Sequence, residues 1–389
     1  MYSIKTLNKI SPVGLEKLDL NRYNCSDSES DPDGIIVRSA SLHEYEFNRN
    51  LKGIARAGAG VNNIPIDKCT AAGIAVFNTP GGNANAVKEL TVASFFLASR
   101  KIVDAINWAQ TLKGKGAEIP ALVEKGKSNF TGPELAGKKL GVIGLGAIGS
   151  LIVNAALGLN MEVYGYDNYL SVESALRMSR GLKRVDSVRA IYENCDYITV
   201  HVPLTPDTKG MINKDVIAQM KDGVRLFNFS RGDIINKEDV AQALESGKIA
   251  KYVTDFPDEE VLAMKNVIAI PHLAASTPES EDNCAVMAVN ELTDYLENGN
   301  TVNSVNFPNV SSERSTGSRI CVLHRNIPNM LTQITSVVSA ENYNIEFMHS
   351  KSRGDVSYAI FDMTKTITDP MIAEKISKVD GVMNVRVID

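Results

Sequence analysis

Arg231, Glu260 and His272 are side chains whose chemistry could act in one site. Arg231 and His272 each come shortly after an apolar run, Val224–Asn228 and Val267–Ile270. If these runs are parallel strands, both residues lie at the carboxyl ends of the strands, where α/β sheets bind ligands. A guanidinium binds a carboxylate through two hydrogen bonds, and histidine carries a proton near neutral pH. With Glu260 to favour the charged imidazole, the set could exchange the hydroxyl proton of a hydroxy acid while a cofactor takes the hydride.

Each of these residues also has a plainer explanation, which the sequence leaves open. Arg231 could be a solvated surface residue, His272 a packed histidine and Glu260 a solvated acid. Position favours the functional interpretation for Arg231, whereas a lone histidine is by default a packed one. The 5 cysteines are odd in number and far apart, without metal-ligand or redox spacing, so we expect reduced thiols and no metal site.

A glycine-rich segment has the spacing of a dinucleotide site. Gly144, Gly146 and Gly149 form a GxGxxG pattern between an apolar strand-like run and a helix-like run. The three glycines allow a tight turn, close approach of the pyrophosphate and close helix–strand packing. Asp167 follows at about the separation expected for the acid that binds the adenosine ribose, and its charge favours NAD over NADP. The alternative is a structural turn with an unrelated surface aspartate.

The elements that must position these residues follow two βα series and a third, mixed one. Five apolar runs belong with the glycine-rich segment and indicate most of a six-stranded doubly wound sheet: residues 139–143, 161–166, 197–200, 224–228 and 267–270. Three earlier runs indicate a second parallel sheet: residues 34–39, 51–56 and 74–78. Helical periodicity from Val87 to about Ala109 predicts a long helix leading from one domain to the next, and Cys284 to Leu296 a helix leading away.

The order of these elements predicts the fold class and its domains. We expect a Rossmann-type cofactor domain over residues 89–281 and a flavodoxin-like substrate domain made of residues 1–88 and 282–306. A segment rich in Ser, Pro, Asn and Gly at 307–318 is typical of a linker. Residues 319–389 have the order strand, helix, strand, strand, helix, strand, which predicts a ferredoxin-like α+β domain.

The motifs together resemble those of the D-isomer-specific 2-hydroxyacid dehydrogenase family over nearly the whole chain. The resemblance implies Arg231 as the ligand of the substrate carboxylate, His272 as the acid/base and Glu260 as the group that tunes His272. Aligning on Phe256-Pro257 selects Glu259 in place of Glu260, and we keep Glu260. The cofactor residues it implies are Gly144, Gly146, Ala147, Ile148, Gly149, Asp167, His201, Val202, Pro203, Phe229, Ser230, Arg231, Asp255, His272 and Ala274. Ala274 stands where the family usually has glycine, which could alter the approach to the cofactor.

The N-terminal motifs resemble those of the phosphoglycerate dehydrogenases within this family. The segment Gly58, Ala59 and Gly60 would offer backbone N–H groups to the substrate carboxylate. Arg38 and Arg56, both at the ends of predicted strands, could neutralise a phosphate. This implies oxidation of 3-phospho-D-glycerate with NAD, the first step of serine synthesis. The plainer alternative is that either arginine pairs with a local acid such as Glu44.

The last segment resembles the ACT domain, a module that binds amino acids at domain interfaces. The resemblance implies L-serine as a feedback inhibitor, with His324, Asn326 and Asn344 as its ligands. Asn329 replaces the usual glycine of a turn, and asparagine tolerates a positive φ, so the turn should survive. Family members dimerise through the cofactor domain and ACT domains pair edge to edge, which implies a homodimer or homotetramer.

The bulk composition limits the other classes of function. With 389 residues, 44% hydrophobic and 22% charged, the chain is an ordinary globular one. A net charge of −5 gives no general attraction for nucleic acid or membrane. Without a signal-peptide pattern at the N-terminus, we expect a cytoplasmic protein. Another D-2-hydroxyacid dehydrogenase, for glycerate or lactate, and a non-catalytic NAD-sensing regulator are the alternatives.

Overall fold

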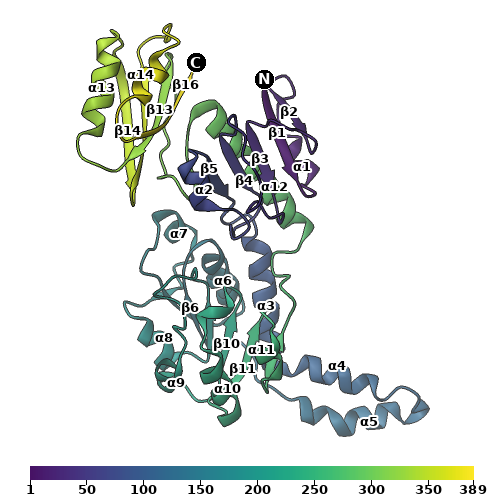
Figure 1. Cartoon of the computed structure of the whole chain (residues 1–389). Coiled ribbons are helices and arrows are strands. Elements are labelled where there is room, and N and C mark those ends of the chain that lie inside the picture. Colours follow the sequence, from purple (N-terminus) through teal and green to yellow (C-terminus); the bar gives the residue numbers. More distant parts are fainter. The chain divides into compact units, whose positions relative to one another are not determined.

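The computed structural model describes residues 1–389, apart from the side chain of residue 173. The chain forms two compact units (Figure 1). The outer unit consists of Met1–Asn83 and Pro278–Asp389, and the inserted unit of Ala84–Thr277. None of the described helices is both long and apolar enough to cross a membrane.

The outer unit contains a parallel sheet in the order β2-β1-β3-β4-β5, the flavodoxin-like order that the sequence predicts. Its strands are β1 Tyr2–Leu7, β2 Tyr23–Ser26, β3 Gly34–Val37, β4 Gly53–Arg56 and β5 Ala75–Asn78. The first two strands were not predicted, because β1 and β2 are only partly buried and carry mixed polar sequences. The helices of this layer are α1 Pro12–Leu15, α2 Ile66–Ala71 and α12 Pro278–Asn298.

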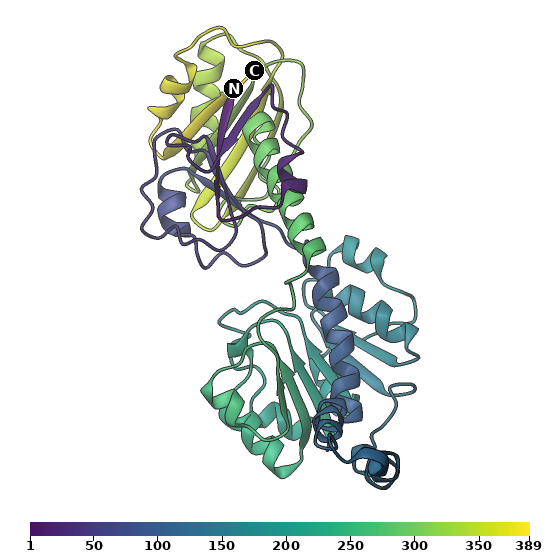
Figure 2. The ribbon, with the colours of Figure 1, turned by 90° about the vertical axis from the view of Figure 1, so that its right-hand side faces the viewer.

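The outer unit also contains an antiparallel sheet with two helices. Its strands lie in the order β14-β15-β13-β16, which confirms the predicted ferredoxin-like topology. Ile320 and Val322 pack under the two helices, whereas Cys321 and Leu323 point to the other face and join the core of the five-stranded sheet. Figure 2 shows the ribbon of the four-stranded sheet and its helices from a second side. The elements are β13 Arg319–Arg325, α13 Met330–Ala340, β14 Ile345–Arg353, β15 Val356–Met363, α14 Ile372–Ser377 and β16 Val382–Ile388. Asn329 has the predicted positive φ, 68°.

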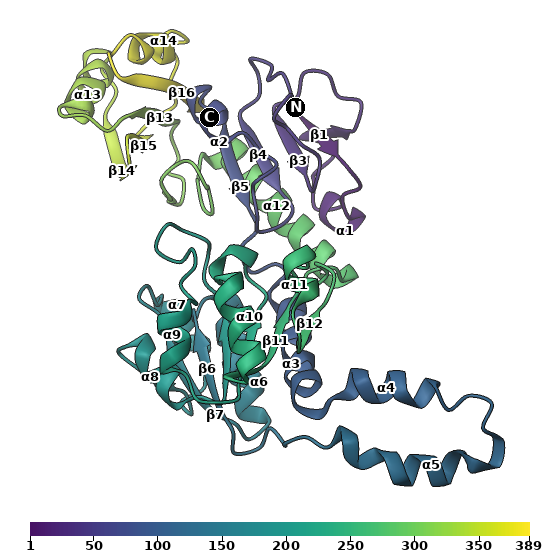
Figure 3. The same ribbon diagram turned by 60° about the horizontal axis from the view of Figure 1, so that its bottom comes forward.

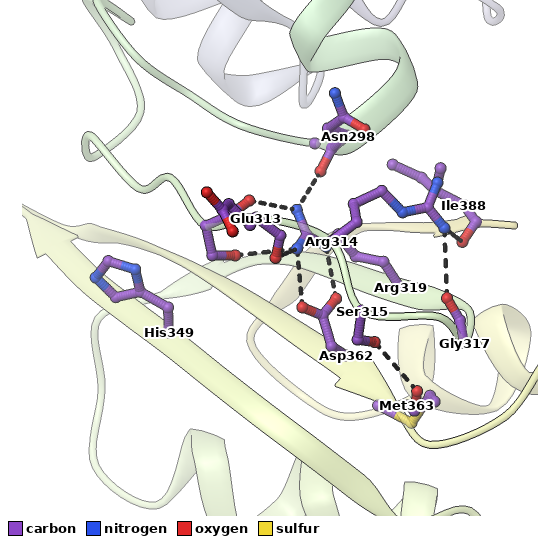
Figure 4. A network of polar contacts seen from close by, with 12 residues as sticks. Asn298, Glu313, Arg314, Ser315, Gly317, Arg319, His349, Asp362, Met363 and Ile388 are labelled. Carbon is purple, nitrogen blue, oxygen red and sulfur yellow. Dashed lines mark hydrogen bonds and ion pairs between the residues drawn. The ribbon is translucent and has the colours of Figure 1, made fainter.

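Arg319, the first residue of the internal strand β13, binds the end of α12. The buried guanidinium of Arg319 donates to the carbonyl oxygens of Asn298, Ser312 and Glu313 (Figure 4). The segment 307–318 has no regular secondary structure, but Phe307 within it is fully buried. The expected linker is therefore packed against the rest of the outer unit.

The inserted unit is built on a parallel sheet in the order β12-β11-β10-β9-β6-β7-β8. This is the Rossmann order with one further strand, so the sheet has seven strands and not the predicted six. Two strands were not predicted: β8, which has only two residues, both exposed, and β11. The strands are β6 Lys139–Ile143, β7 Glu162–Tyr166, β8 Lys183–Arg184, β9 Tyr197–Val200, β10 Val224–Asn228, β11 Ile249–Thr254 and β12 Val267–Ala269.

Helices cover both faces of the seven-stranded sheet. One apolar core lies beneath α3 and α6 and the other beneath α8, α9 and α10. The predicted long helix over 87–109 is wrong as one element, because Lys101 adopts a left-handed conformation with φ 43° and separates α3 from α4. Figure 3 shows α4 and α5 as a pair projecting from the sheet. The helices are α3 Ala84–Arg100, α4 Ile102–Gln110, α5 Ile119–Gly126, α6 Ala147–Gly158, α7 Val172–Arg177, α8 Val188–Asn194, α9 Lys214–Gln219, α10 Lys237–Ser246 and α11 Glu259–Ala263.

Candidate functional site

The glycine-rich turn lies at the carboxyl end of β6 and needs its glycines. Gly144 has φ 93°, and a Cβ on it would lie 2.5 Å from the carbonyl oxygen of His201. A Cβ on Gly149 would lie 1.9 Å from the carbonyl oxygen of Gly144. Both positions therefore exclude a side chain for steric reasons, as a tight strand–turn–helix connection requires.

The start of α6 is open in front. Gly146 precedes the helix without a side-chain cap, and Ala147 and Ile148 begin its first turn. A Cβ on Gly146 would meet no atom within 4 Å. Unpaired N–H groups at a helix start, with free space before them, fit a pyrophosphate. The turn thus fits the phosphates of a dinucleotide.

Asp167 follows β7 and is held by the same turn. Its Oδ2 accepts a hydrogen bond of 2.7 Å from the amide of Leu145, and its Oδ1 accepts one of 2.7 Å from Tyr169. These bonds orient the carboxylate beside the glycine-rich turn. A charge in this position suits the ribose hydroxyls of an adenosine and opposes a 2′-phosphate.

His201 borders the turn at the carboxyl end of β9. Its Nε2 lies 2.7 Å from Oγ1 of Thr199, and its buried Nδ1 has no partner among the described residues. Burial lowers the pKa of His201 to about 3, so the imidazole is neutral at physiological pH. Val202 and Pro203, also predicted at the cofactor, continue the loop after this strand.

A short turn at the end of β10 positions Arg231. Asn228 is fully buried, donates from Nδ2 to the carbonyl oxygen of Arg231 at 2.8 Å and accepts from the amide of Ser230. Ser230 in turn donates to the carbonyl oxygen of Val200 at 2.8 Å, and Phe229 is buried. The turn leaves the Arg231 side chain exposed at the carboxyl edge of the sheet. Asn228 was not predicted as a site residue, although asparagine at a strand end is a typical turn former.

Asp255, at the end of β11, is the acid that lies in the electrostatic field of His272. Burial raises the pKa of Asp255, and the positive charges of His272 and Arg231 act in the opposite direction, as do backbone amides that include Ala274. The carboxylate is 1% exposed, and neither oxygen accepts a well-formed hydrogen bond from the described residues. The ring of Phe256 packs on that of His272 with centroids 4.7 Å apart. Arg231, Asp255 and His272 therefore gather at one edge of the inserted unit.

Glu260 lies on the exposed first turn of α11. Its carboxylate pairs with Lys237 at 3.2 Å and its side chain is 70% exposed. The same lysine binds Asp258. Glu259 is also exposed, next to Glu260. The choice between Glu260 and Glu259 as the partner of His272 stays a prediction.

In the outer unit, the predicted substrate residues lie at the carboxyl ends of β3 and β4. Arg56 donates from Nε to the carbonyl oxygen of Arg38 at 3.0 Å, and its guanidinium covers Gly58, where a Cβ would lie 2.3 Å from Nη1. We expected the amide of Gly58 to be available to a ligand. Instead it donates to the carbonyl oxygen of Arg56. Within the described part of the chain, the amides of Ala59 and Gly60 donate no hydrogen bond. 

Arg38 pairs with an acid that the sequence did not indicate. Its Nη2 lies 2.6 Å from Oε1 of Glu281, in the first turn of α12. The local acid considered as an alternative, Glu44, is not this partner. A contact between residues so far apart in the chain has no short-range sequence signal.

The predicted effector residues lie at two different ends of the four-stranded sheet. His324 is buried near the end of β13, its Nδ1 is 2.8 Å from the carbonyl oxygen of Arg325, and burial lowers its pKa. Asn326 follows and donates to the carbonyl oxygen of Gly354 at 3.0 Å. Asn344 precedes β14, whose first residue pairs beside the other end of β13. The antiparallel registers thus separate Asn344 from His324 by about 23 Å along the strands.

Comparisons with known proteins find related chains. The model of the D-isomer specific 2-hydroxyacid dehydrogenase NAD binding domain matches residues 92–274. D-3-phosphoglycerate dehydrogenase of Haemophilus influenzae is 33% identical over 341 residues, which cover 85% of this chain and 79% of that protein. The Bacillus subtilis enzyme of the same name is 34% identical over 331 residues, and the chain spans only 60% of its length.

The fold comparison leads to the same group. The NAD⁺-bound 3-phosphoglycerate dehydrogenase of Entamoeba histolytica superposes with a TM-score of 0.61 at 25% identity, covering 78% of this chain and 98% of that one. The chain therefore belongs to the D-isomer-specific 2-hydroxyacid dehydrogenase family.

Proposed function

We propose that the chain oxidises 3-phospho-D-glycerate to 3-phosphohydroxypyruvate with NAD, the first step of L-serine biosynthesis. The observation that carries this substrate is the pair of arginines, Arg38 and Arg56, at the carboxyl ends of adjacent strands β3 and β4. Two guanidinium groups suit a phosphate, and an unphosphorylated glycerate or lactate has no need of both. The Haemophilus influenzae and Bacillus subtilis relatives bear the name of this activity.

The glycine-rich turn would hold NAD, which would supply the acceptor for the hydride from C2 of the substrate. The residues of the chain handle the rest of the reaction. An imidazole nitrogen of His272 takes the proton from the C2 hydroxyl, so that the carbonyl forms as the hydride leaves. Arg231 binds the substrate carboxylate and the developing carbonyl oxygen through its fork of N–H groups.

A carboxylate beside His272 favours its charged form after proton transfer. Glu260 is the residue that the family resemblance implies, with Glu259 as the alternative. Asp255 is a third candidate, since it is buried and its pKa responds to the charge of His272. The family resemblance also implies a place for Asp255 near the nicotinamide carboxamide.

The proposal is tested by following NADH formation with 3-phospho-D-glycerate, D-glycerate and D-lactate side by side. Turnover confined to the phosphorylated acid supports the proposal. Turnover of the uncharged acids alone indicates a broader D-2-hydroxyacid dehydrogenase. NADH binding without turnover of any acid indicates a regulator that senses NAD.

The four-stranded sheet is proposed to be an ACT regulatory domain that binds L-serine. The polar residues His324, Asn326 and Asn344 are its expected ligands. Because one chain keeps Asn344 at the opposite end of the sheet from His324, a pocket that uses all three residues requires a second copy. Calorimetric titration with L-serine, in parallel with inhibition of turnover, tests this; no heat and no inhibition would end it.

A homodimer or homotetramer is proposed for the assembly. The support is the α4–α5 pair, which has no buried residue and leaves apolar side chains such as Val103 and Ile106 at 41% and 55% exposure. Light scattering with Ile106→Glu, which should weaken the assembly, tests this surface.

A cytoplasmic location is also proposed, because reduced cysteines are typical of cytosolic proteins. All five cysteines are unpaired, and burial raises the pKa of Cys69 and Cys195 to about 12.

A further inference from the structure

Glu281 is the acid that meets the expected phosphate ligand Arg38. Its Oε1 lies 2.6 Å from Nη2 of Arg38, and the two side chains are 42% and 39% exposed. Both charges can therefore be reached by an anion from solvent. The pair forms where the first turn of α12 packs beside the end of β3.

The two arginines are linked, so an anion that binds both comes near Glu281. Nε of Arg56 donates to the carbonyl oxygen of Arg38, and its guanidinium lies against Gly58. A phosphate ester carries a charge of about −1.5 to −2 at pH 7. At the separation of a shared arginine, two anions repel each other even in a well-solvated site.

We infer that Glu281 sets the affinity for the phosphorylated substrate by competing with its phosphate for Arg38. This rests on the proposed function for the identity of the substrate. In the free protein the carboxylate neutralises Arg38. On binding, the phosphate takes over that guanidinium or shares it with Glu281, and part of its binding energy offsets the lost ion pair. A substrate without a phosphate does not compete with Glu281 for Arg38, so its affinity does not depend on this ion pair.

The test is Glu281→Gln, which keeps the shape of the side chain and removes its charge. We expect KM for 3-phospho-D-glycerate to fall about fivefold, as for an exposed charge pair, with the change confined to KM. Inhibition by inorganic phosphate should strengthen by a similar factor, whereas binding of D-glycerate should not change. Glu279→Gln is the matched control, because Glu279 is an exposed acid in the same turn without an ion pair to Arg38.

A second variant shows whether the gain acts through Arg38. In an Arg38→Ala background, Glu281→Gln should bring no further improvement. A KM that stays constant or rises in the single variant overturns the inference and makes Glu281 a positioning residue. If the wild-type protein does not oxidise 3-phospho-D-glycerate, the proposed function fails, and calorimetry with inorganic phosphate still decides about Glu281. Equal or absent phosphate binding in wild type and Glu281→Gln then contradicts the inference.

Discussion

Arg319 and Asp362 form a bidentate ion pair across the neighbouring strands β13 and β15. Nε of the arginine lies 2.6 Å from Oδ1, and Nη2 lies 2.8 Å from Oδ2. The side chains are 0% and 2% exposed. The remaining donors of Arg319 satisfy carbonyl oxygens at the end of α12 and in the segment that follows, so the pair joins three parts of the outer unit (Figure 4).

Removing this arginine should destabilise the outer unit strongly. Arg319→Met leaves the Asp362 carboxylate buried without its counter-charge, and we expect a loss of about 3–5 kcal/mol in the free energy of unfolding. Urea unfolding measures it. Arg189→Met is the control, because Arg189 pairs with Glu193 on the surface of α8, and its loss should cost about 0.5 kcal/mol or less. Equal effects of the two variants would show that burial of the pair does not matter.

Replacing His272 should remove the proton carrier without removing the cofactor site. We expect kcat of His272→Ala to fall by about 10²- to 10⁴-fold, with NADH binding by fluorescence retained. Asp255→Asn should lower kcat/KM, because it removes the buried acid whose charge interacts with that of His272. Glu260→Gln and Glu259→Gln, measured beside it, identify which acid acts on His272. An unchanged kcat/KM for Asp255→Asn would leave Asp255 only a cofactor contact.

A variant of the glycine-rich turn can test cofactor binding without disturbing the fold. Gly146→Val should fold normally, because the space around a Cβ there is empty, yet weaken NADH binding by filling the approach to the helix start. Gly158→Ala, at the other end of α6 and equally open, is the control and should bind NADH as the wild type does. Fluorescence titration of NADH and the thermal midpoint of each variant give both readouts. Unaltered NADH binding in Gly146→Val would place the pyrophosphate elsewhere.

Glu291 on α12 should make stability depend on pH. Burial raises the pKa of Glu291 from 4.5 to about 8, while Asn303 donates to its Oε1 at 2.7 Å. Between pH 4.5 and about pH 8 the Glu291 carboxyl is ionised in the unfolded chain but still protonated in the folded one. The free energy of unfolding therefore falls as pH rises through this range and then levels off. We expect a fall of about 2 kcal/mol, less than the full shift implies, because the side chain is only partly buried.

Glu291→Gln does not titrate, so it should match the wild type near pH 4.5 and exceed it in stability at pH 8. Urea unfolding at both values measures the difference. Parallel curves for the two proteins would mean that the carboxylate is solvated when it ionises.

Local patterns in the sequence predict most of the fold and part of the candidate site. The GxGxxG spacing, with its strand and helix, predicts the turn at Gly144, and the residue type at 329 predicts its positive φ. Both depend on neighbours within a few residues, where propensity and sterics act directly. Short-range patterns of the same kind predict that Arg38 and Arg56 lie at the ends of strands.

The features that the sequence did not reveal depend on tertiary contacts. Glu281 reaches Arg38 only because α12 returns to β3 after the whole inserted unit, and no spacing rule connects them. The break at Lys101 occurs inside a continuous helical pattern, since an apolar periodicity reports the buried face and not the backbone angle of one lysine. Strand β8 is too short and too polar to have a pattern of its own.

The division of the outer unit has a consequence for synthesis on the ribosome. Met1–Asn83 is complete long before Pro278–Asp389 exists, and the core of its sheet needs residues of α12 and of β13 from the later segment. Domains generally fold as units while the chain grows. The inserted unit, continuous from Ala84 to Thr277, can therefore reach its native state while the first 83 residues still expose apolar strands to chaperones. A nascent chain stalled before α12 should be protease-resistant in its second part and sensitive in its first.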